Sequence, residues 1–511
     1  MEERTIIDGE VSGEYEPLTA EEQAALDAWL GSAEPLAASA SYTIPVDPHR
    51  LVAPASAGQE QIWMHCEMAG GQVLYNEAVT VHYHGEFDTI ALNRSLDEFI
   101  RRHAAWRTTF TWHDGALRQV VHPRVEIPMP FMDLSGLAER EREERAVSIA
   151  CGDALIPFDL SRGPLLRCRL IRFSEFEHRL YLTLHHIIFD GVSLYGIFLP
   201  QLASLYRAYA SGVSPQPNQY TVQYPDYAEW QRKRVQEGEL ASQLQYWKET
   251  LANLPTLDLR PDFPRGEVQS FHGSMERFLV PAAVAEGLRE IGRRTGATLF
   301  MVLTAVLTEQ LRRRCGQVDI PLGSASSSRK WSETESVVGF FLNTIVLRVD
   351  ASGDPTFLQL VERVREVTIA ALSRDDVPFA LLAREFAPRR DASAHPLFQV
   401  MFSLEPPLGE LDPGWRFTQM DVETGITKFD LHLEMDERKD GILARFIYNT
   451  DLFFADTIQR MAEEWQTIAK AVVAAPELPL SELSGGRQTG VWQRLRGLFG
   501  TKKAHGGSLA S

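Results

Sequence analysis

Hydrophobic and polar positions along the central part of the chain follow two different periods. Alternating segments rich in β-branched and aromatic residues predict strands, and apolar positions that recur every three to four residues predict helices. The two kinds of segment follow one another without a long internal repeat, so the pattern predicts a mixed α/β body. The expected strands are 79–88, 179–190, 318–328 and 337–350, and the expected helices are 89–106 and a pair within 281–316 that divides near Gly296.

The stretch SGVSPQPNQ, residues 211–219, is the clearest linker signal inside this body. Clustered Ser, Pro, Gly and Asn residues are typical of loops between folded segments. We therefore expect an N-terminal lobe over 48–219 and a C-terminal lobe over 220–484.

The two ends of the chain differ from the body in charge. Residues 1–47 contain eleven acidic residues and one Arg, and residues 485–511 contain five basic residues and no acidic one. The acidic segment includes an amphipathic run over 18–30, and the basic segment carries apolar residues at helical spacing between Val491 and Phe499. Each end is a candidate docking element for a partner. A helix packed on the body, for the first, and a frayed tail, for the second, are the alternatives.

Composition excludes several classes of protein. The 511 residues are 44% hydrophobic and 23% charged, as in folded globular proteins, and the net charge of −18 argues against nucleic-acid binding. No uncharged apolar run is long enough to span a membrane, and the acidic N-terminus lacks the apolar core of a signal peptide. The four cysteines are scattered without CxxC spacing. We expect a cytoplasmic protein without a structural zinc site.

Candidate chemistry concentrates in one segment, LHHIIFDG, residues 184–191. If this segment continues a strand, successive side chains alternate, so His185 and His186 face opposite sides and cannot share one task. Asp190 then falls in the following turn, and we expect Gly191 to adopt a backbone conformation that other residues resist. A His at a strand end with an Asp in the next turn suits proton transfer near neutral pH.

Three other interpretations of the paired histidines compete with proton transfer. They could be core residues, metal ligands or part of a Ser-His-Asp triad. No further cluster of metal-ligand spacing lies nearby, and no GxSxG motif is present. A P-loop and a GxGxxG motif are also missing from the sequence, so neither ATP nor a dinucleotide is indicated.

The segment HHIIFDG resembles the HHxxxDG signature of the condensation domains of nonribosomal peptide synthetases. Five further stretches resemble the other motifs of that family, in family order and over about 51–484. Gln61, Ala104 and Ser328 depart from the family pattern, which has Arg, Glu and Gly there. The five stretches are SAGQEQIW (56–63), RHAAWRTTF (102–110), YPDYAEW (224–230), VGFFLNTIVLR (338–348) and RRDASAHPLFQVMF (389–402).

The resemblance implies a fold of two chloramphenicol-acetyltransferase-like lobes that form a V-shaped pseudo-dimer with a tunnel between them. It implies transfer of an acyl group from a carrier-protein phosphopantetheine thioester to an amine, giving an amide, or to a hydroxyl, giving an ester. The domain would have no cofactor of its own, because the phosphopantetheine arm belongs to a partner carrier protein. We expect a monomer.

The resemblance also implies roles for the residues of the signature. His186 would face the tunnel as general base or as the group that positions the nucleophile, and His185 would be structural. Asp190 would anchor its loop to an Arg. Arg329 is the first candidate for that Arg, and Arg348 is the second.

Further roles follow from the same resemblance. The backbone of Gly191 would approach the reacting centre and donate a hydrogen bond to the developing oxyanion. Arg102 and Arg107 would support the active lobe, with salt bridging inside the lobe as the alternative. Tyr224, Asp226 and Trp230 would shape the lobe junction, and Asn343 and Ser393 would line the tunnel.

Three classes of function remain open from the sequence. The first is a condensation enzyme that uses carrier-bound donors, the second is a soluble acyltransferase that uses coenzyme A thioesters, and the third is a non-catalytic domain that recruits carriers. The intact HHIIFDG segment argues against the third. The sequence starts with Met and stops shortly after residue 484, so the resemblance suggests a free-standing enzyme that meets its carrier proteins in trans.

Overall fold

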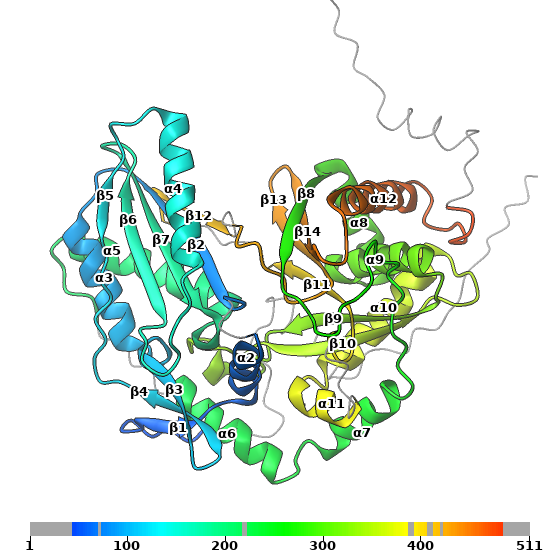
Figure 1. Cartoon of the computed structure of the whole chain (residues 1–511), viewed down its shortest axis with the longest axis horizontal. Coiled ribbons are helices and arrows are strands. Elements are labelled where there is room, and N and C mark those ends of the chain that lie inside the picture. Colours follow the sequence, from blue (N-terminus) through cyan, green and yellow to red (C-terminus); the bar gives the residue numbers. More distant parts are fainter. Residues whose placement is uncertain are drawn as a thin grey trace, which may run out of the picture.

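The chain folds into two lobes that lie side by side, each built around its own β-sheet (Figure 1). The computed structural model describes residues 43–69, 73–216, 222–386, 393–405, 412–419 and 423–483. The amphipathic run 18–30 and the basic tail 485–511 lie outside the described residues. None of the helices in the described ranges is long and apolar enough to cross a membrane.

The N-terminal lobe contains a five-stranded sheet in the order β12-β2-β7-β6-β5. Its central pair, β2 and β7, is antiparallel, and alternate residues such as Val79 and Leu182 face the core beneath α3 and α5. Helix α4 covers the opposite face through Ala146 and Ala150. The elements are β2 (Asn76–His84), α3 (Thr89–Arg102), β5 (Phe131–Asp133), α4 (Glu139–Ala154), β6 (Leu166–Arg172), β7 (Glu177–His185), α5 (Leu199–Ala210) and β12 (Trp415–Gln419).

A small sheet and two helices complete this lobe near the junction with the other one (Figure 1). The sheet order is β1-β4-β3. Helix α2 begins with a capping box in which the Ser56 hydroxyl accepts the Gln59 amide N–H, which satisfies a backbone donor at the helix start. The elements are β1 (Val52–Pro54), α2 (Ala57–Met68), η1 (Ala104–Arg107), β3 (Thr108–His113), β4 (Ala116–Val121) and α6 (Tyr224–Gln236), and α7 (Ala241–Thr250) then leads to the second lobe.

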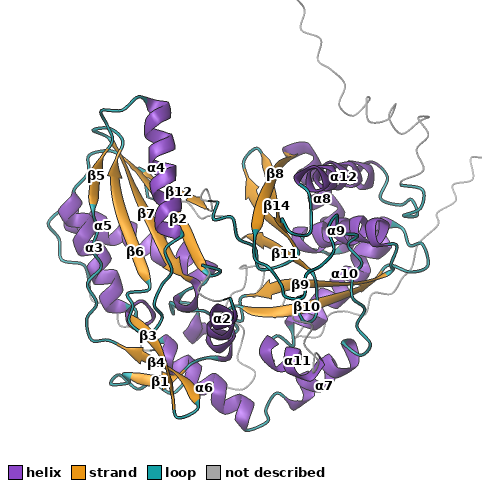
Figure 2. Ribbon diagram, in the orientation of Figure 1, coloured by secondary structure: helices purple, strands orange, loops and turns teal. Residues whose placement is uncertain are grey.

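The C-terminal lobe contains a six-stranded sheet in the order β10-β9-β11-β13-β14-β8. Figure 2 shows α8, α9, α10 and α12 on the side of this sheet that is turned away from the other lobe. The elements are β8 (Gly273–Pro281), α8 (Ala282–Thr295), α9 (Leu299–Cys315), β9 (Asp319–Ser326), η4 (Ser332–Thr334), β10 (Asn343–Asp350), α10 (Phe357–Leu372), α11 (Phe379–Phe386), β11 (Val400–Glu405), β13 (Leu431–Arg438), β14 (Gly441–Asn449) and α12 (Ala455–Ala474).

The two faces of the C-terminal sheet differ in polarity because side chains alternate along each strand. On β13, Leu431, Leu433 and Met435 belong to the hydrophobic core under the helices. The intervening residues His432, Glu434 and Asp436 therefore point to the opposite face. The second face of this sheet therefore carries ionisable side chains where the first face carries apolar ones.

Two segments of the C-terminal half cross into the N-terminal lobe. The loop 327–342 between β9 and β10 places Val337, Val338 and Phe341 in the N-terminal core. Strand β12 pairs with β2, antiparallel, at the edge of the N-terminal sheet. The lobes are thus tied together by backbone and by shared core, and the loop 327–342 reaches the turn that carries the candidate chemistry.

Most of the expected strands and helices are present, but the expected strand 337–350 begins only at Asn343, because residues 337–342 belong to the loop that packs into the N-terminal lobe. Helices α8 and α9 are separated at Gly296, which has a left-handed φ of 60° and caps α8 as the sequence indicates. Trp230 belongs to the N-terminal hydrophobic core and Leu240 to the C-terminal one, and the expected lobe boundary at residue 219 stays a prediction. Helix α6 stays with the N-terminal core because Tyr227 packs against Phe341 of the inserted loop.

Candidate active site

The HHIIFDG segment lies where β7 ends and the chain turns into a short helix. The strand stops at His185, earlier than expected, and His186 begins the 3₁₀ turn η2 (His186–Ile188). One further ladder bond, from the His186 amide N–H to the Tyr75 carbonyl (2.8 Å), holds the turn against the start of β2. The helix that follows, η3 (Val192–Phe198), continues into α5.

His185 is a buried histidine whose side chain is neutral at neutral pH. Its side chain is 4% exposed, and its Nδ1 accepts the Ile187 amide N–H at 3.3 Å, so the ring proton lies on Nε2. That Nε2 lies 3.6 Å from the Cys66 sulfur. Burial lowers the pKa of His185 to about 3 and raises the pKa of the Cys66 thiol to about 12. Neither group is therefore charged at neutral pH, and the pair does not form a thiolate nucleophile.

His186 carries the opposite tautomer. Its Nδ1 lies 2.9 Å from the Phe189 carbonyl, which only accepts hydrogen bonds, so the proton lies on Nδ1 and Nε2 keeps its lone pair. The ring is held by stacking on Phe189 (4.8 Å between centroids) and by the edge contact with Phe340 (5.3 Å). Burial lowers the pKa of His186 below its usual value. The arrangement presents a fixed, neutral imidazole, which is the form that accepts a proton.

Asp190 is completely buried and accepts hydrogen bonds on both carboxylate oxygens. Oδ1 accepts from the amide N–H and the hydroxyl of Ser193, each at 2.7 Å, and Oδ2 accepts from the Phe341 amide N–H at 3.0 Å. The Ser193 hydroxyl in turn accepts the Gly339 amide N–H at 3.0 Å. The carboxylate thus joins the turn after the histidines to the inserted loop 327–342, and it has no contact that would make it an acid or base.

Arg329 supplies the positive charge that balances Asp190. Its Nη2 lies 2.9 Å and 3.0 Å from the two carboxylate oxygens, and its Nη1 donates to the carbonyls of Thr334 and Val337 at 2.6 Å and 2.8 Å. The guanidinium also lies 4.0 Å above the Phe341 ring. A planar group with several donors can bind a carboxylate and a loop backbone together. Of the two candidates from the sequence, the structure brings Arg329 to Asp190.

Arg348 is not at this site, and its expected alternative role is corrected. It lies near the far end of β10, where its guanidinium binds the Asp319 carboxylate (Nη2–Oδ2 2.7 Å) and the Thr250 and Ala252 carbonyls. The side chain secures the end of the C-terminal sheet.

Gly191 also differs from expectation. Its φ of −58° and ψ of −44° are those of an ordinary right-handed helix, so no special backbone conformation explains the glycine. A Cβ added there would meet the Tyr195 ring at 3.5 Å and Oε2 of Glu405 at 3.9 Å, which are ordinary contact distances. The glycine leaves open a space between the start of η3 and a carboxylate of the other lobe.

The polar face of the C-terminal sheet stands opposite this turn. Arg445 on β14 lies 2.7 Å from both the Glu434 and the Asp436 carboxylates, and all three are largely buried. Burial raises the pKa of Glu434, and the neighbouring Glu405 and Asp436 add to that effect against the opposing Arg445. We call Glu405, Glu434, Asp436 and Arg445 the acidic wall.

Tyr224 and Trp230 lie at the junction between the lobes. The Tyr224 hydroxyl donates to the Phe340 carbonyl and lies 2.8 Å from the Ser56 hydroxyl, and its ring occupies the space beside Gly339. Trp230 makes an edge contact with Trp331, at 4.6 Å between centroids. Both aromatic side chains pack against the loop 327–342.

The Asn343 side chain binds backbone groups, and the Ser393 carbonyl lies beside the ion pair between Arg265 and Asp430. The Asn343 amide donates to the Asp375 and Val377 carbonyls at 2.7 Å each and accepts the Phe379 amide N–H at 2.9 Å. The Ser393 carbonyl accepts from Arg265, which also binds Asp430. Asn343 fixes the turn before α11 and leaves little of its amide free for a substrate.

Arg102, Arg107 and Asp226 make contacts inside the N-terminal lobe. Arg102 binds Glu98 at 2.7 Å and the Gln216 carbonyl at 2.9 Å, and Arg107 donates to the Ile100 and His122 carbonyls. Asp226 accepts from Arg50 at 3.1 Å. Arg102 thus forms a salt bridge inside the lobe, whereas the partners of Arg107 are backbone carbonyls, and the support of the active lobe by the two arginines stays a prediction.

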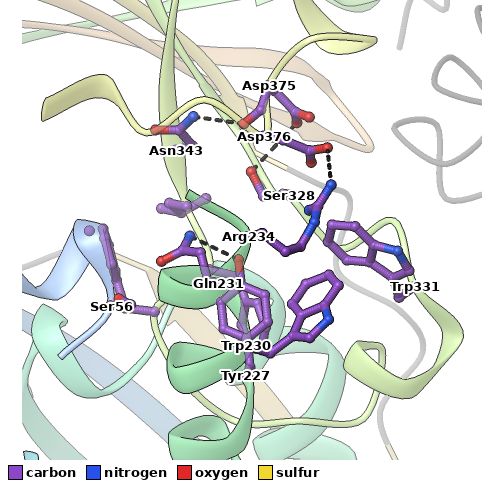
Figure 3. Close-up of a pocket in the computed structure, with 14 residues that line it drawn as sticks. Ser56, Tyr227, Trp230, Gln231, Arg234, Ser328, Trp331, Asn343, Asp375 and Asp376 are labelled. Atoms are coloured by element: carbon purple, nitrogen blue, oxygen red, sulfur yellow. Dashed lines mark hydrogen bonds and ion pairs between the residues drawn. The ribbon is translucent and has the colours of Figure 1, made fainter. Parts of the chain in front are cut away.

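A small polar cavity of about 20 Å³ lies beside this junction (Figure 3). It is bounded by Arg234, Trp230 and Trp331 on one side and by Asn343 and Asp375 on the other. Such a volume holds about one water molecule, so the cavity does not accommodate an acyl chain as it stands.

Sequence reasoning missed several residues of the site. Ser193 completes the hydrogen-bond network of Asp190. The sequence pattern that could have identified it is Asp-x-x-Ser, in which the Asp caps the start of a helix. Glu77 and Lys428, which form an ion pair across the lobes at 2.9 Å, are 351 residues apart and carry no local signal. The acidic wall is likewise assembled from three strands. Among the described residues, no group of three His, Cys, Asp or Glu side chains could hold a metal ion.

Comparison with known proteins identifies relatives over most of the chain. The family model "Condensation domain" matches residues 50–488. The chain is 37% identical over 440 residues to chondramide synthase cmdD of Chondromyces crocatus, and 34% identical over 458 residues to phosphinothricin tripeptide synthetase PhsB of Streptomyces viridochromogenes. These matches cover 86% and 88% of this chain but only 11% and 38% of the two relatives.

Solved structures show the same fold. The X-domain from teicoplanin biosynthesis is 26% identical with a TM-score of 0.76, over 87% of this chain and 100% of that one. The first condensation domain of the calcium-dependent antibiotic synthetase is 19% identical with a TM-score of 0.73, over 85% of this chain and 99% of that one, and this likeness shows the fold alone. The expected fold of two acetyltransferase-like lobes is confirmed. The chain therefore belongs to the condensation-domain family of nonribosomal peptide synthesis.

Proposed function

We infer that this chain is an active condensation enzyme that forms an amide from a carrier-bound acyl thioester and an amine. The observation that carries the proposal is the state of His186. Its Nδ1 proton is engaged by the Phe189 carbonyl, its ring is held by two phenylalanines, and its Nε2 has no hydrogen-bond partner among the described residues. A fixed imidazole with one free lone pair can accept the proton of an attacking amine.

The reaction assigns a task to each part of the turn. The amine nitrogen attacks the thioester carbon, its proton passes to His186 Nε2, and the carrier thiolate leaves and takes up a proton. The Gly191 amide N–H, at the first turn of a helix, is available to the developing oxyanion because early helical N–H groups have no acceptor within the helix. Asp190 and Arg329 hold the turn and take no part in proton transfer.

The donor we propose is a phosphopantetheine thioester on a carrier protein acting in trans. The family membership supports this choice, because the relatives include a tripeptide synthetase. No cofactor of the chain itself enters the reaction, and the phosphopantetheine arm arrives with the carrier. A hydroxyl acceptor, which would give an ester, and a coenzyme A donor are the alternatives within the same chemistry. We propose that the protein acts as a cytoplasmic monomer.

Product formation followed by mass spectrometry tests the proposal. Acyl-carrier, acyl-pantetheine and acyl-coenzyme A donors are offered with a panel of amines and alcohols to the full chain, to His186→Ala and to His113→Ala. His113 is an exposed histidine of the same lobe and serves as the matched control. We expect amide from the carrier donor, a loss of about 10²–10⁴-fold in His186→Ala and no loss in His113→Ala. Equal use of coenzyme A would instead indicate a soluble acyltransferase.

A non-catalytic recruiting role has one specific observation in its favour. A structural neighbour at 26% identity is the X-domain of teicoplanin biosynthesis, solved in complex with OxyB. Tight binding of acyl-carrier without product from any donor, together with unchanged binding in His186→Ala, would support recruitment and contradict the catalytic proposal.

A further inference from the structure

An ion pair between the lobes lies beside His186. Glu77 on β2 stands opposite Leu184 on β7, and the ladder continues through the bond from the His186 amide to the Tyr75 carbonyl. His186 itself begins the turn η2, but this backbone bond places it beside Tyr75, two residues before Glu77 along the chain. The side chains of Glu77 and His186 are close enough for the charge of each to shift the pKa of the other.

The positive partner comes from the other lobe. Lys428, in the segment before β13, places its Nζ 2.9 Å from Oε1 of Glu77 and 4.7 Å above the Tyr75 ring. Both side chains are mostly buried, at 30% and 23% exposed. Burial acts to raise the pKa of Glu77, but the charge and hydrogen bond of Lys428, together with His186 and His432, outweigh it, so the pKa is lowered and the carboxylate is ionised. The pair is therefore a charged contact between the lobes at the edge of the candidate active site.

The other titratable groups around His186 are already balanced or neutral. Asp190, on its own turn, is bound by Arg329. His185 on β7 and His432 on β13 are neutral, because burial lowers the pKa of each to about 3. Among the described residues, the charges with the largest effect on the pKa of His186 are Glu77 and Lys428, and they act in opposite directions. The carboxylate favours the protonated imidazole and the ammonium disfavours it.

We propose that Glu77 is a positioning residue for His186 and that Lys428 is its counter-charge from the other lobe, so that contact between the lobes adjusts how readily His186 holds a proton. The inference rests on the proposed function of His186. During amide formation the imidazole becomes positively charged when it takes the amine proton. The Glu77 carboxylate stabilises that charge, and the Lys428 ammonium limits the stabilisation so that the neutral base persists before reaction.

Two single variants with opposite predicted effects test the proposal. In Glu77→Gln the loss of negative charge lowers the pKa of His186, and in Lys428→Met the loss of positive charge raises it, each by on the order of one pH unit. The double variant Glu77→Gln/Lys428→Met falls between the two. The exposed residues Glu86 and Lys439 supply matched controls, as Glu86→Gln and Lys439→Met, which remove the same charges far from His186 and leave its titration in place.

Two measurements are made on the full chain. The first is the titration of the His186 Cε1–H signal by NMR, assigned by its loss in His186→Gln. The second is the acidic limb of the pH profile of kcat/KM, which moves down in Glu77→Gln and up in Lys428→Met. Shifts in the same direction in both variants, or an unmoved His186 signal, would overturn the inference, because damage to the fold alone does not give opposite shifts.

The two measurements also separate this inference from the proposed function. If His186→Ala keeps full activity while the NMR titration shifts as expected, the ion pair acts on His186 but His186 is not the base. If His186→Ala loses activity while the titration does not shift, the catalytic proposal stands and the role of Glu77 is refuted.

Discussion

One nitrogen of Arg329, Nη2, lies within 3.0 Å of both carboxylate oxygens of Asp190, although the two residues are 139 positions apart. Asp190 follows the paired histidines in the N-terminal lobe, and Arg329 stands in the loop that the C-terminal lobe inserts. Their side chains are 0% and 5% exposed, so neither charge is solvated by water. The geometry of the histidine turn thus depends on a buried charge pair between the lobes.

Removal of either charge should therefore destabilise the protein strongly. Asp190→Ala leaves a buried guanidinium without its counter-charge, and we expect a loss of about 3–5 kcal/mol in the free energy of unfolding. Chemical denaturation measures the change. Arg348→Met is the matched control, because its partner Asp319 is 38% exposed and such pairs contribute at most ~1 kcal/mol. Equal effects of the two variants would contradict the assigned pairing.

Substitution by alanine should change the stability of the protein differently at Gly339 and at Gly191, which flank this network. A Cβ on Gly339 would lie 1.9 Å from the Tyr224 ring, whereas a Cβ on Gly191 would meet its neighbours at 3.5 Å or more. We expect Gly339→Ala to cost about 1–3 kcal/mol of stability and Gly191→Ala to change stability little, since its backbone is already helical.

Turnover of the Gly191→Ala variant then tests whether a substrate uses the space beside Gly191. If the acyl or amine group passes beside the turn, Gly191→Ala retains the wild-type melting temperature and loses turnover, because its methyl group occupies that space. Thermal denaturation and the product assay on the same preparation give the answer. A Gly191→Ala variant with full activity would show that substrates do not use the space beside Glu405.

Ser328 departs from the glycine of the family and yet keeps a glycine-like conformation. Its φ of 48° is left-handed, which costs a non-glycine residue about 1–2 kcal/mol. Ser328→Gly should therefore raise the free energy of unfolding by about 0.5–1 kcal/mol, after the greater freedom of glycine in the unfolded chain is allowed for.

The comparison variant for that prediction is Ser326→Gly on β9. The Ser326 hydroxyl donates to the buried Asp375 carboxylate, so its loss should destabilise the protein. Thermal denaturation of both variants measures these two changes in stability. A Ser328→Gly protein that melts below wild type would show that the weak 3.5 Å contact of the Ser328 hydroxyl with Asp375 outweighs the backbone strain.

The parts of the fold and site that could be predicted share one property, which is that their signal is local. The break at Gly296 and the alternation of β7 are set by residues within one or two turns of each other. The partner of Asp190 was predictable only through the family resemblance, since nothing local links positions 190 and 329. The special backbone conformation expected of Gly191 is wrong for a different reason, because a glycine can be needed for the space that it leaves as well as for its backbone freedom, and the sequence does not separate the two.

The residues that escaped prediction are those assembled by topology. Glu405 on β11, Glu434 on β13 and Arg445 on β14 meet because these strands are neighbours in the sheet, and β11 pairs with β13 in parallel across a long connection. Each one taken alone resembles a polar residue on the exposed face of a strand. Only the packing of the N-terminal lobe over that face makes them a buried acidic wall.

The acidic wall should make stability depend on pH in a defined direction. Burial beside Glu405 and Asp436 raises the pKa of Glu434 above its unfolded value of about 4.3, in spite of Arg445. Such a group contributes its full stability below the unfolded pKa, and that contribution is lost as pH rises through the folded pKa. We therefore expect Glu434→Gln, which has no proton to lose, to gain stability relative to wild type between pH 5 and pH 8.

Chemical denaturation at pH 5 and pH 8 measures this change. Glu437→Gln on the same strand removes a charge of the same kind from a less buried position, where the side chain is 27% exposed, and serves as the control. If the difference between Glu434→Gln and wild type stays constant over this range, or reverses, Arg445 holds Glu434 ionised and the wall is a balanced ion-pair network. A difference that grows with pH shows instead that Arg445 cannot keep both of its carboxylates charged, which leaves one of the two acids protonated.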